Sequence, residues 1–468
     1  MANILIVTRG LPSLVYPGVE LARRLAAAGH CVTVAGDPDD RRLVEHHALA
    51  FLPLEPGGYE EFLKTDHSVP RLTRLMNVRR RRGLASESLG MRGFVEAVRG
   101  VRADLLLING EMHEHIITAS GAGMRVALLN SFVSIWRQPG VPPPHHVARP
   151  GTGWRGTRAG MSLLWGALRV RKWWRVWHDR CLRIGCDHTS VLRKLSREVG
   201  FDFAREIDAS QWLIPFTYRR LPALTLHALE FEFPHRPPDH VRYVGPMVLE
   251  SRLDRRPEPV DMARLDAVIA RRFAGGGRRT LIYAAFGSVL STDLQFLRHL
   301  VRIVAERPAW DLVISLSNGI APSSLAPLPE RVHVFSWLPQ LHVLAHTDVA
   351  VTHGGINTID ECVVHGVPVL VYCGGQTDMA GTTSRVVHHG IGLAGDRRRD
   401  GPAEIRGHVD RLIEEPVFHE NLRGLRRRYA AYVQDRVAER AVESLLGGLA
   451  ERDRVHADQG PGRPRKTP

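Results

Sequence analysis

The stretch that decides the fold reads THGGINTIDE, residues 352–361. Its first residue, Thr352, ends a strand-like run that begins at Val349. Two glycines directly after a strand let the backbone turn closely, and Asn357 and Thr358 are residue types that favour the start of a helix. In an open parallel sheet, ligands bind where strands end and helices begin. The stretch therefore predicts an anion site at a helix N-terminus, with Glu361 one turn further on and able to accept hydrogen bonds from a diol.

Two further loops follow strand-like runs in the same half of the chain. Gly287 and Ser288 come after the run from Thr280 to Phe286, and the Ser288 hydroxyl is suited to holding a phosphate. A polar loop, residues 374–378, comes after the run from Val369 to Tyr372. One glycine loop after a strand is most often only a tight turn. Three such loops in order indicate a single ligand site.

Over residues 335–393 the chain resembles the family 1 UDP-glycosyltransferases, in the branch that acts on bacterial natural products such as macrolides. The resemblance rests on the loops above and on Ser336-Trp337-Leu338-Pro339-Gln340, Gly366-Val367-Pro368 and Asp378. It implies an α/β protein of the GT-B fold, with two facing Rossmann-like domains, parallel sheets and a C-terminal crossover helix. It also implies a nucleotide-sugar donor in the C-terminal half, with no metal ion and no other cofactor.

The resemblance assigns roles to particular residues of the donor site. Trp337 stacks on the base, Gln340 contacts base and ribose, and Asp378 bonds hydroxyls of the sugar. The diphosphate is held by His353 and Thr358 together with amides near Gly355 and Asn357. Glu361 binds the ribose hydroxyls, which favours UDP over dTDP because only a ribonucleotide offers two vicinal hydroxyls. Family members follow the aspartate with glutamine, whereas Met379 stands here, so Gln376 is the substitute and a deoxysugar becomes more plausible.

The family's catalytic pair is missing from the aligned positions. Where the family has a histidine base and an aspartate partner, this chain has Leu14 and Asn109, neither of which can take up a proton. Glu111 and His113 follow at the mouth of the same sheet, and one hypothesis is that either of them is the general base. The alternatives are that these residues only begin a solvated helix, or that the acceptor is a phenol or amine that needs little help.

Strand-like runs alternate with helical patterns in both halves, which predicts parallel sheets covered on both faces. At 468 residues the chain is too long for one core. We expect an acceptor-binding Rossmann-like domain over residues 1–246, a linker over 247–278, a nucleotide-sugar-binding domain over 279–452 and a disordered tail over 453–468. A single long helix is predicted over 421–446, and by analogy with the family it crosses back onto the first domain.

Residues 165–182 read as an amphipathic helix with tryptophans on one side and cations on the other. Such a helix is either packed into the core with its cations reaching solvent, or it forms an apolar wall for the acceptor or a membrane-interface contact. The formal net charge of +14 indicates attraction to anions, or else arginines spread over the surface. Five scattered cysteines suit a reduced cytoplasm, so we expect a cytoplasmic protein with peripheral contact at the inner membrane face.

The leading functional hypothesis is inverting, metal-independent transfer of a sugar to a lipophilic small-molecule or lipid acceptor. The alternative is a catalytically impaired GT-B protein that binds a nucleotide sugar as a sensor or as the activator of a partner. A dinucleotide oxidoreductase is disfavoured because neither Gly10 nor Gly287 opens a Gly-x-Gly-x-x-Gly turn. Nucleic acid is not an expected partner, because only arginine content points to it and no recognised module accompanies it.

Overall fold

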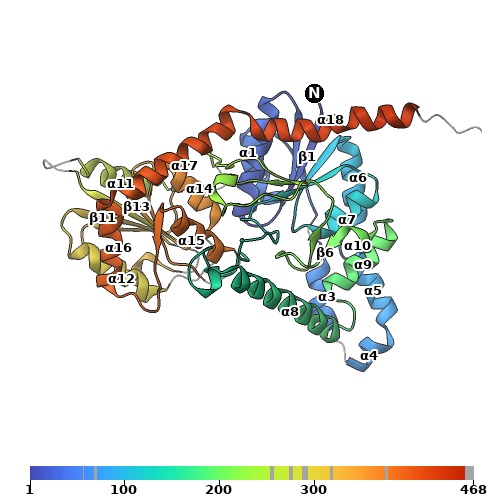
Figure 1. Ribbon diagram of the computed structural model, residues 1–468, viewed down its shortest axis with the longest axis horizontal. Helices are drawn as coiled ribbons and strands as arrows, with labels where there is room; N and C mark the ends of the chain where they lie inside the picture. The colour runs from blue at the N-terminus through green and yellow to red at the C-terminus, as the bar shows by residue number, and fades with distance from the viewer. Residues whose placement is uncertain are drawn as a thin grey trace, which may run out of the picture.

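The computed structural model describes residues 1–55, 57–67, 71–252, 258–273, 278–286, 293–316, 320–374 and 378–458. Within these residues two α/β domains lie side by side, and two helices, α17 (Pro416–Gln434) and α18 (Val437–Asp458), run from the second domain across the first (Figure 1). Among the same residues, no helix is both long and apolar enough to cross a membrane.

The first domain is built on a parallel sheet. Its strands are β1 (Asn3–Val7), β2 (Cys31–Gly36), β3 (Ala50–Pro53), β4 (Leu105–Asn109), β5 (Val126–Asn130), β8 (Ala223–Thr225) and β9 (Val241–Tyr243). They lie in the order β3-β2-β1-β4-β5-β8-β9. A separate antiparallel pair is formed by β6 (Ile207–Asp208) and β7 (Thr217–Tyr218). The predicted parallel sheet is therefore confirmed for this half, and β1 and β4 end side by side.

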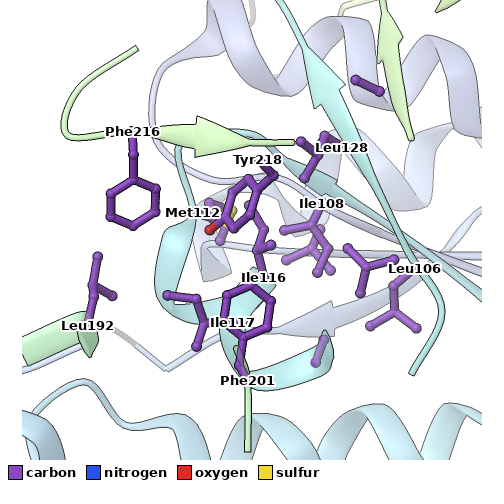
Figure 2. Packing of buried hydrophobic residues seen from close by; sticks show 14 of the residues in the cluster. Leu106, Ile108, Met112, Ile116, Ile117, Leu128, Leu192, Phe201, Phe216 and Tyr218 are labelled. Carbon is purple, nitrogen blue, oxygen red and sulfur yellow. The ribbon is translucent and has the colours of Figure 1, made fainter. Parts of the chain in front are cut away.

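The helices of this domain lie against both faces of the sheet or extend away from it (Figure 1). They are α1 (Pro12–Ala27), α2 (Arg41–His46), α3 (Tyr59–His67), α4 (Arg71–Met76), α5 (Val78–Glu87), α6 (Met91–Val101), α7 (His113–Gly121), α8 (Arg158–Leu182), α9 (His188–Glu198) and α10 (Phe203–Glu206). Because side chains alternate along a strand, Leu106 and Ile108 of β4 enter one core with Ile116 and Ile117 of α7 (Figure 2). Leu107 enters the opposite core instead.

The second domain repeats this plan. Its strands are β10 (Thr280–Ala285), β11 (Trp310–Ser315), β12 (Val332–Phe335), β13 (Val349–Thr352), β14 (Val369–Val371) and β15 (Gly392–Ala394), in the order β12-β11-β10-β13-β14-β15. Its other helices are α11 (Pro259–Arg271), α12 (Leu294–Ala305), α13 (Gln340–Leu344), α14 (Ile356–His365), α15 (Met379–His388) and α16 (Pro402–Glu414). All described strand pairs of this sheet are parallel, as predicted.

Two features modify the expected organisation. The segment expected as linker, residues 247–278, contains α11, whose Leu265 and Val268 are buried in the core of the second domain. The single long helix predicted over 421–446 is two helices, because the chain breaks at Asp435 and Arg436, the latter with a φ of 50°. Helix α18 crosses back as expected, since Ala438, Ala441 and Val442 pack with α1. It extends to Asp458, and the remainder of the expected tail, 459–468, lies outside the described residues.

The prediction that helix α8 has its tryptophans on one side and its cations on the other is wrong, and Trp173 and Trp177 are not packed into the core. Trp165 is buried and donates from Nε1 to the Val141 carbonyl at 2.9 Å. Lys172 is also buried, whereas Trp173, Trp174 and Trp177 are exposed. Lys172 Nζ donates to the carbonyls of Gln211 and Leu213, each at 2.6 Å. Those two carbonyls lie beneath the helix and need donors, so the amine points inward and the three tryptophans point outward.

Candidate active site at the domain junction

The loop after β13 depends on glycine. Gly354 has a φ of +90°, which side chains rarely allow, and a Cβ atom there would lie 2.9 Å from Val371 Cγ1. Gly355 is the N-cap residue of α14. The first amides of a helix have no partner within it, so the start of α14 offers donors and positive potential to an anion, as the sequence predicted.

His353 lies against this helix start. A Cβ atom on Gly355 would lie only 2.9 Å from His353 Nε2, so the glycine lets the imidazole edge and the helix N-terminus share one space. Burial lowers the pKa of His353 to about 4, against a hydrogen bond to the Ala285 backbone that favours the charged form. The ring is therefore neutral near pH 7 with a single N–H, and protonation next to an anion gives it a second N–H that can donate to that anion.

Asn357 and Thr358 occupy the first turn of α14. The Asn357 side-chain amide donates to the Ser13 carbonyl at 2.7 Å, so it bridges to the first turn of α1 in the first domain. Its backbone amide belongs to the helix start. Thr358 Oγ1 accepts from Gln340 Nε2 at 3.3 Å. The structure thus brings Gln340, His353, Gly355, Asn357 and Thr358 together, while Trp337 lies half-buried directly after β12.

Glu361 is not an open carboxylate. It is buried and pairs with Arg252, and its other oxygen accepts from Gln340 Nε2 at 2.5 Å. Arg252 also lies over the Tyr16 ring of α1, with 4.4 Å from the guanidinium carbon to the ring centroid. Sequence reasoning missed Arg252 because it stands in a charged stretch expected to be linker, where nothing in the local pattern marks one arginine out.

Glu111 supplies the first domain's contribution. It follows β4, and its backbone amide donates to the Asn109 side chain at 3.0 Å, so Asn109 holds the turn that presents it. Solvent reaches Glu111, yet protein atoms crowd it closely enough that burial raises its pKa, and the charge of Asp378 raises it further. Asp378 is buried directly before α15. Two carboxyl groups from different domains are therefore close enough for their charges to interact.

His113 lies elsewhere. It is buried, its Nδ1 is 3.2 Å from the Tyr218 hydroxyl, and its ring packs on Phe216 with centroids 4.6 Å apart. Burial lowers its pKa to about 4. This imidazole therefore packs against the core shown in Figure 2, where Phe216 and Tyr218 are drawn. His113 is thus a buried core residue, whereas Glu111 is exposed.

Buried polar contacts between the two domains fix their positions relative to each other at the site. His227 of the first domain contacts Asp360 of α14 at 2.6 Å, and the Tyr429 hydroxyl donates to the same carboxylate at 2.7 Å. Burial alone would lower the pKa of His227, but Asp360 outweighs it and the pKa is raised. Glu232 of the first domain pairs with Arg385 of α15, and both are buried. These contacts attach the helices that begin at the donor site, α14 and α15, to the opposite domain.

Two predicted site residues, Ser288 and Gln376, lie outside the described residues. Within the described ranges no group of three or more histidine, cysteine, aspartate or glutamate side chains is arranged to hold a metal ion. The chemistry available at the junction is thus a helix N-terminus with a neutral imidazole on one side and a carboxylate of raised pKa on the other.

Residues 301–443 match the family described as Erythromycin biosynthesis protein CIII-like, C-terminal domain. The chain is also 31% identical over 218 residues to 4'-demethylrebeccamycin synthase of Lentzea aerocolonigenes. The matched residues include the stretch, 335–393, on which the predicted resemblance to the family 1 glycosyltransferases rests. The alignment with the relative covers 46% of this chain and 47% of that protein, so the chain spans about half the length of that protein.

Solved structures extend the likeness to nearly the whole length of this chain. The glycotransferase of kitacinnamycin superposes with a TM-score of 0.64 at 22% identity, covering 95% of this chain and 98% of that one. The glycosyltransferase VinC, in complex with dTDP, superposes with a TM-score of 0.59 at 20% identity, covering 94% and 100%. At such identities the likeness shows the fold, and the predicted GT-B fold is confirmed.

Proposed function

We propose that this chain is an inverting glycosyltransferase that moves a sugar from a nucleoside diphosphate to a hydroxyl of a lipophilic acceptor. The observation that carries the proposal is the start of α14, where His353 and Gly355 lie together and Met379, the residue after Asp378, lies beside Gly354. The charge of Asp378 also reaches Glu111 of the first domain. Support for a natural-product acceptor comes from the likeness to 4'-demethylrebeccamycin synthase and to the kitacinnamycin glycotransferase.

In this proposal Glu111 takes the proton of the acceptor hydroxyl, whose oxygen attacks the anomeric carbon. The bond from that carbon to the diphosphate oxygen breaks, and the nucleoside diphosphate leaves with the electron pair. The start of α14 and the His353 imidazole stabilise the charge that develops on the leaving group, and no metal ion is needed for this. Asp378 accepts hydrogen bonds from the sugar. Attack from the face opposite the leaving group inverts the anomeric configuration.

The proposal is tested by incubating the purified protein with UDP-glucose and dTDP-glucose and a panel of polyketide-like phenols and alcohols. Formation of a glycoside, or hydrolysis of the donor above background, supports the enzyme. Nucleotide binding without either reaction would instead support the alternative of a protein that only binds a nucleotide sugar. Absence of any nucleotide binding would contradict both.

The pH dependence of the reaction reports on Glu111. A base must be ionised to work, so kcat/KM rises as pH rises through the Glu111 pKa, which burial and then Asp378 raise above the ordinary value. Asp378→Asn removes the second of these causes, and we expect the acidic limb of the profile to move to lower pH. Glu361→Gln is the matched control, because it alters the donor site without altering a charge that acts on Glu111. A limb that stays in place in Asp378→Asn would contradict the pairing.

We expect the preference of the donor site between UDP and dTDP to depend on Arg252. The sequence favoured UDP on the premise of a free carboxylate at Glu361, but both carboxylate oxygens already accept hydrogen bonds. Arg252→Ala frees one oxygen for the ribose 2′-hydroxyl, which dTDP lacks. Because a hydrogen bond to a charged group contributes about 1.5–3 kcal/mol, we expect the ratio of UDP to dTDP affinity to rise roughly tenfold or more.

Calorimetric titration of both nucleotides into the wild type and into Arg252→Ala measures this ratio. Arg264→Ala serves as control, since Arg264 lies over Phe335 of the same domain and pairs with Asp261. An unchanged ratio in Arg252→Ala would show that Glu361 does not read the ribose.

A further inference from the structure

One face of helix α8 is apolar and exposed along its length. Leu163, Val170, Trp174 and Trp177 follow one another at helical spacing on this face, with Trp173 beside them. The three tryptophans are 64%, 55% and 46% exposed for Trp173, Trp174 and Trp177 respectively. Soluble proteins rarely present a continuous apolar surface of this kind unless it contacts something. We call these five residues the α8 stripe.

The outward direction of the α8 stripe is set by the opposite face of the helix. Trp165 and Lys172 lie on that face, and both are buried with hydrogen bonds to backbone carbonyls. Rotating the helix to hide the stripe would break these hydrogen bonds and leave buried carbonyls without donors, which is costly. The exposure is therefore built into the packing of the domain.

The apolar surface continues onto α4 and α5 at the far end of α8, where Figure 1 shows α4 at the tip of this arm. A cavity of about 610 Å³ lies between them, with apolar walls from Leu75, Trp177 and Ile184. Arg82 and Arg180 also line it. Trp177 stacks against Trp173 with ring centroids 6.4 Å apart, so stripe and cavity share one wall.

The charge around the α8 stripe is predominantly positive. Residues 71–87 and 158–182 contain twelve arginines and lysines and only two acidic residues, Glu87 and Asp179, in a chain whose formal net charge is +14. Arg169, Arg171 and Arg175 are exposed on α8, and their spacing from the stripe places them on its two flanks. The surplus positive charge of the sequence is thus concentrated on this arm.

We propose that the α8 stripe binds the surface of an anionic lipid bilayer, with α8 lying in the plane of the headgroups. Tryptophan prefers the headgroup level of a bilayer, and a helix with an apolar face flanked by arginines lies in that interface. Each arginine near an anionic surface adds electrostatic attraction to it. The uniform positive flanks complement a lipid surface, and a nucleotide-binding site in the other domain remains free of it.

Flotation of the purified full chain with vesicles tests this proposal. We expect binding to vesicles of phosphatidylcholine mixed with phosphatidylglycerol, weak binding to pure phosphatidylcholine, and release as salt is raised, because screening weakens the attraction. The variant Trp173→Ala/Trp174→Ala/Trp177→Ala should lose about tenfold or more in partitioning, since it removes most of the apolar surface that enters the interface. These side chains are exposed, so its thermal unfolding should match that of the wild type.

Phe273→Ala is the matched control, because Phe273 is an aromatic residue, 66% exposed, in the second domain. It should bind vesicles as the wild type does. Three results would overturn the proposal: no binding to anionic vesicles, equal binding by the triple variant, or a wild-type dimer that the triple variant breaks while vesicles have no effect. The last would make the α8 stripe an interface between two copies of this chain.

Discussion

Glu111→Gln is expected to lower kcat by about 10²–10⁴-fold, the range that positioned general bases contribute. Glutamine keeps the size of the side chain and cannot accept the acceptor's proton. Nucleotide affinity should change little, because Glu111 comes from the first domain and the donor loops from the second. Steady-state kinetics with a hydroxyl acceptor, together with titration of UDP and dTDP, separates the two effects.

The control for this variant is His113→Ala. His113 packs against Phe216 in the core, so its removal should lower the midpoint of thermal unfolding while leaving the pH profile of the remaining activity in place. If Glu111→Gln retains full kcat with alcohol acceptors, the base is another group. Activity retained only with phenols would mean that ionised acceptors bypass it.

His353→Ala is expected to lower kcat by about 10²–10³-fold, as removal of one preorganised hydrogen-bond donor to a developing negative charge commonly does. The imidazole is neutral near pH 7 and lies beside the first amides of α14. The leaving diphosphate gains charge as its bond to the sugar breaks, so the loss should appear more in kcat than in KM.

His353→Gln provides the matched comparison, because it keeps a donor of similar reach and should recover part of the loss. His365→Ala tests specificity, since His365 is the last residue of the same helix, far from its N-terminus. Equal kcat for His353→Ala and the wild type would remove the imidazole from the leaving-group site. Unchanged kcat together with unchanged nucleotide affinity would place the diphosphate elsewhere.

The sequence alone was enough for the strand that ends at the two glycines. Residues 349–352 are a strand with the boundaries predicted, because a run of apolar residues between turn signals is a local property. The same holds for the start of α14, where two glycines follow a strand. The position of Glu111 just after β4 also followed from the local sequence. The sequence by itself likewise shows that position 14 is a leucine, which cannot take up a proton.

Contacts between distant residues decided the rest. The pairing of Glu361 with Arg252 and the approach of Glu111 to Asp378 join segments far apart in the sequence, and no local pattern encodes which partner a charged side chain finds. The direction of α8 was decided in the same way. Helical spacing shows that Lys172 and Trp174 lie on different faces of the helix. Which of the two faces is buried depends on the two carbonyls beneath the helix, because buried carbonyls need hydrogen-bond donors and the lysine amine supplies them.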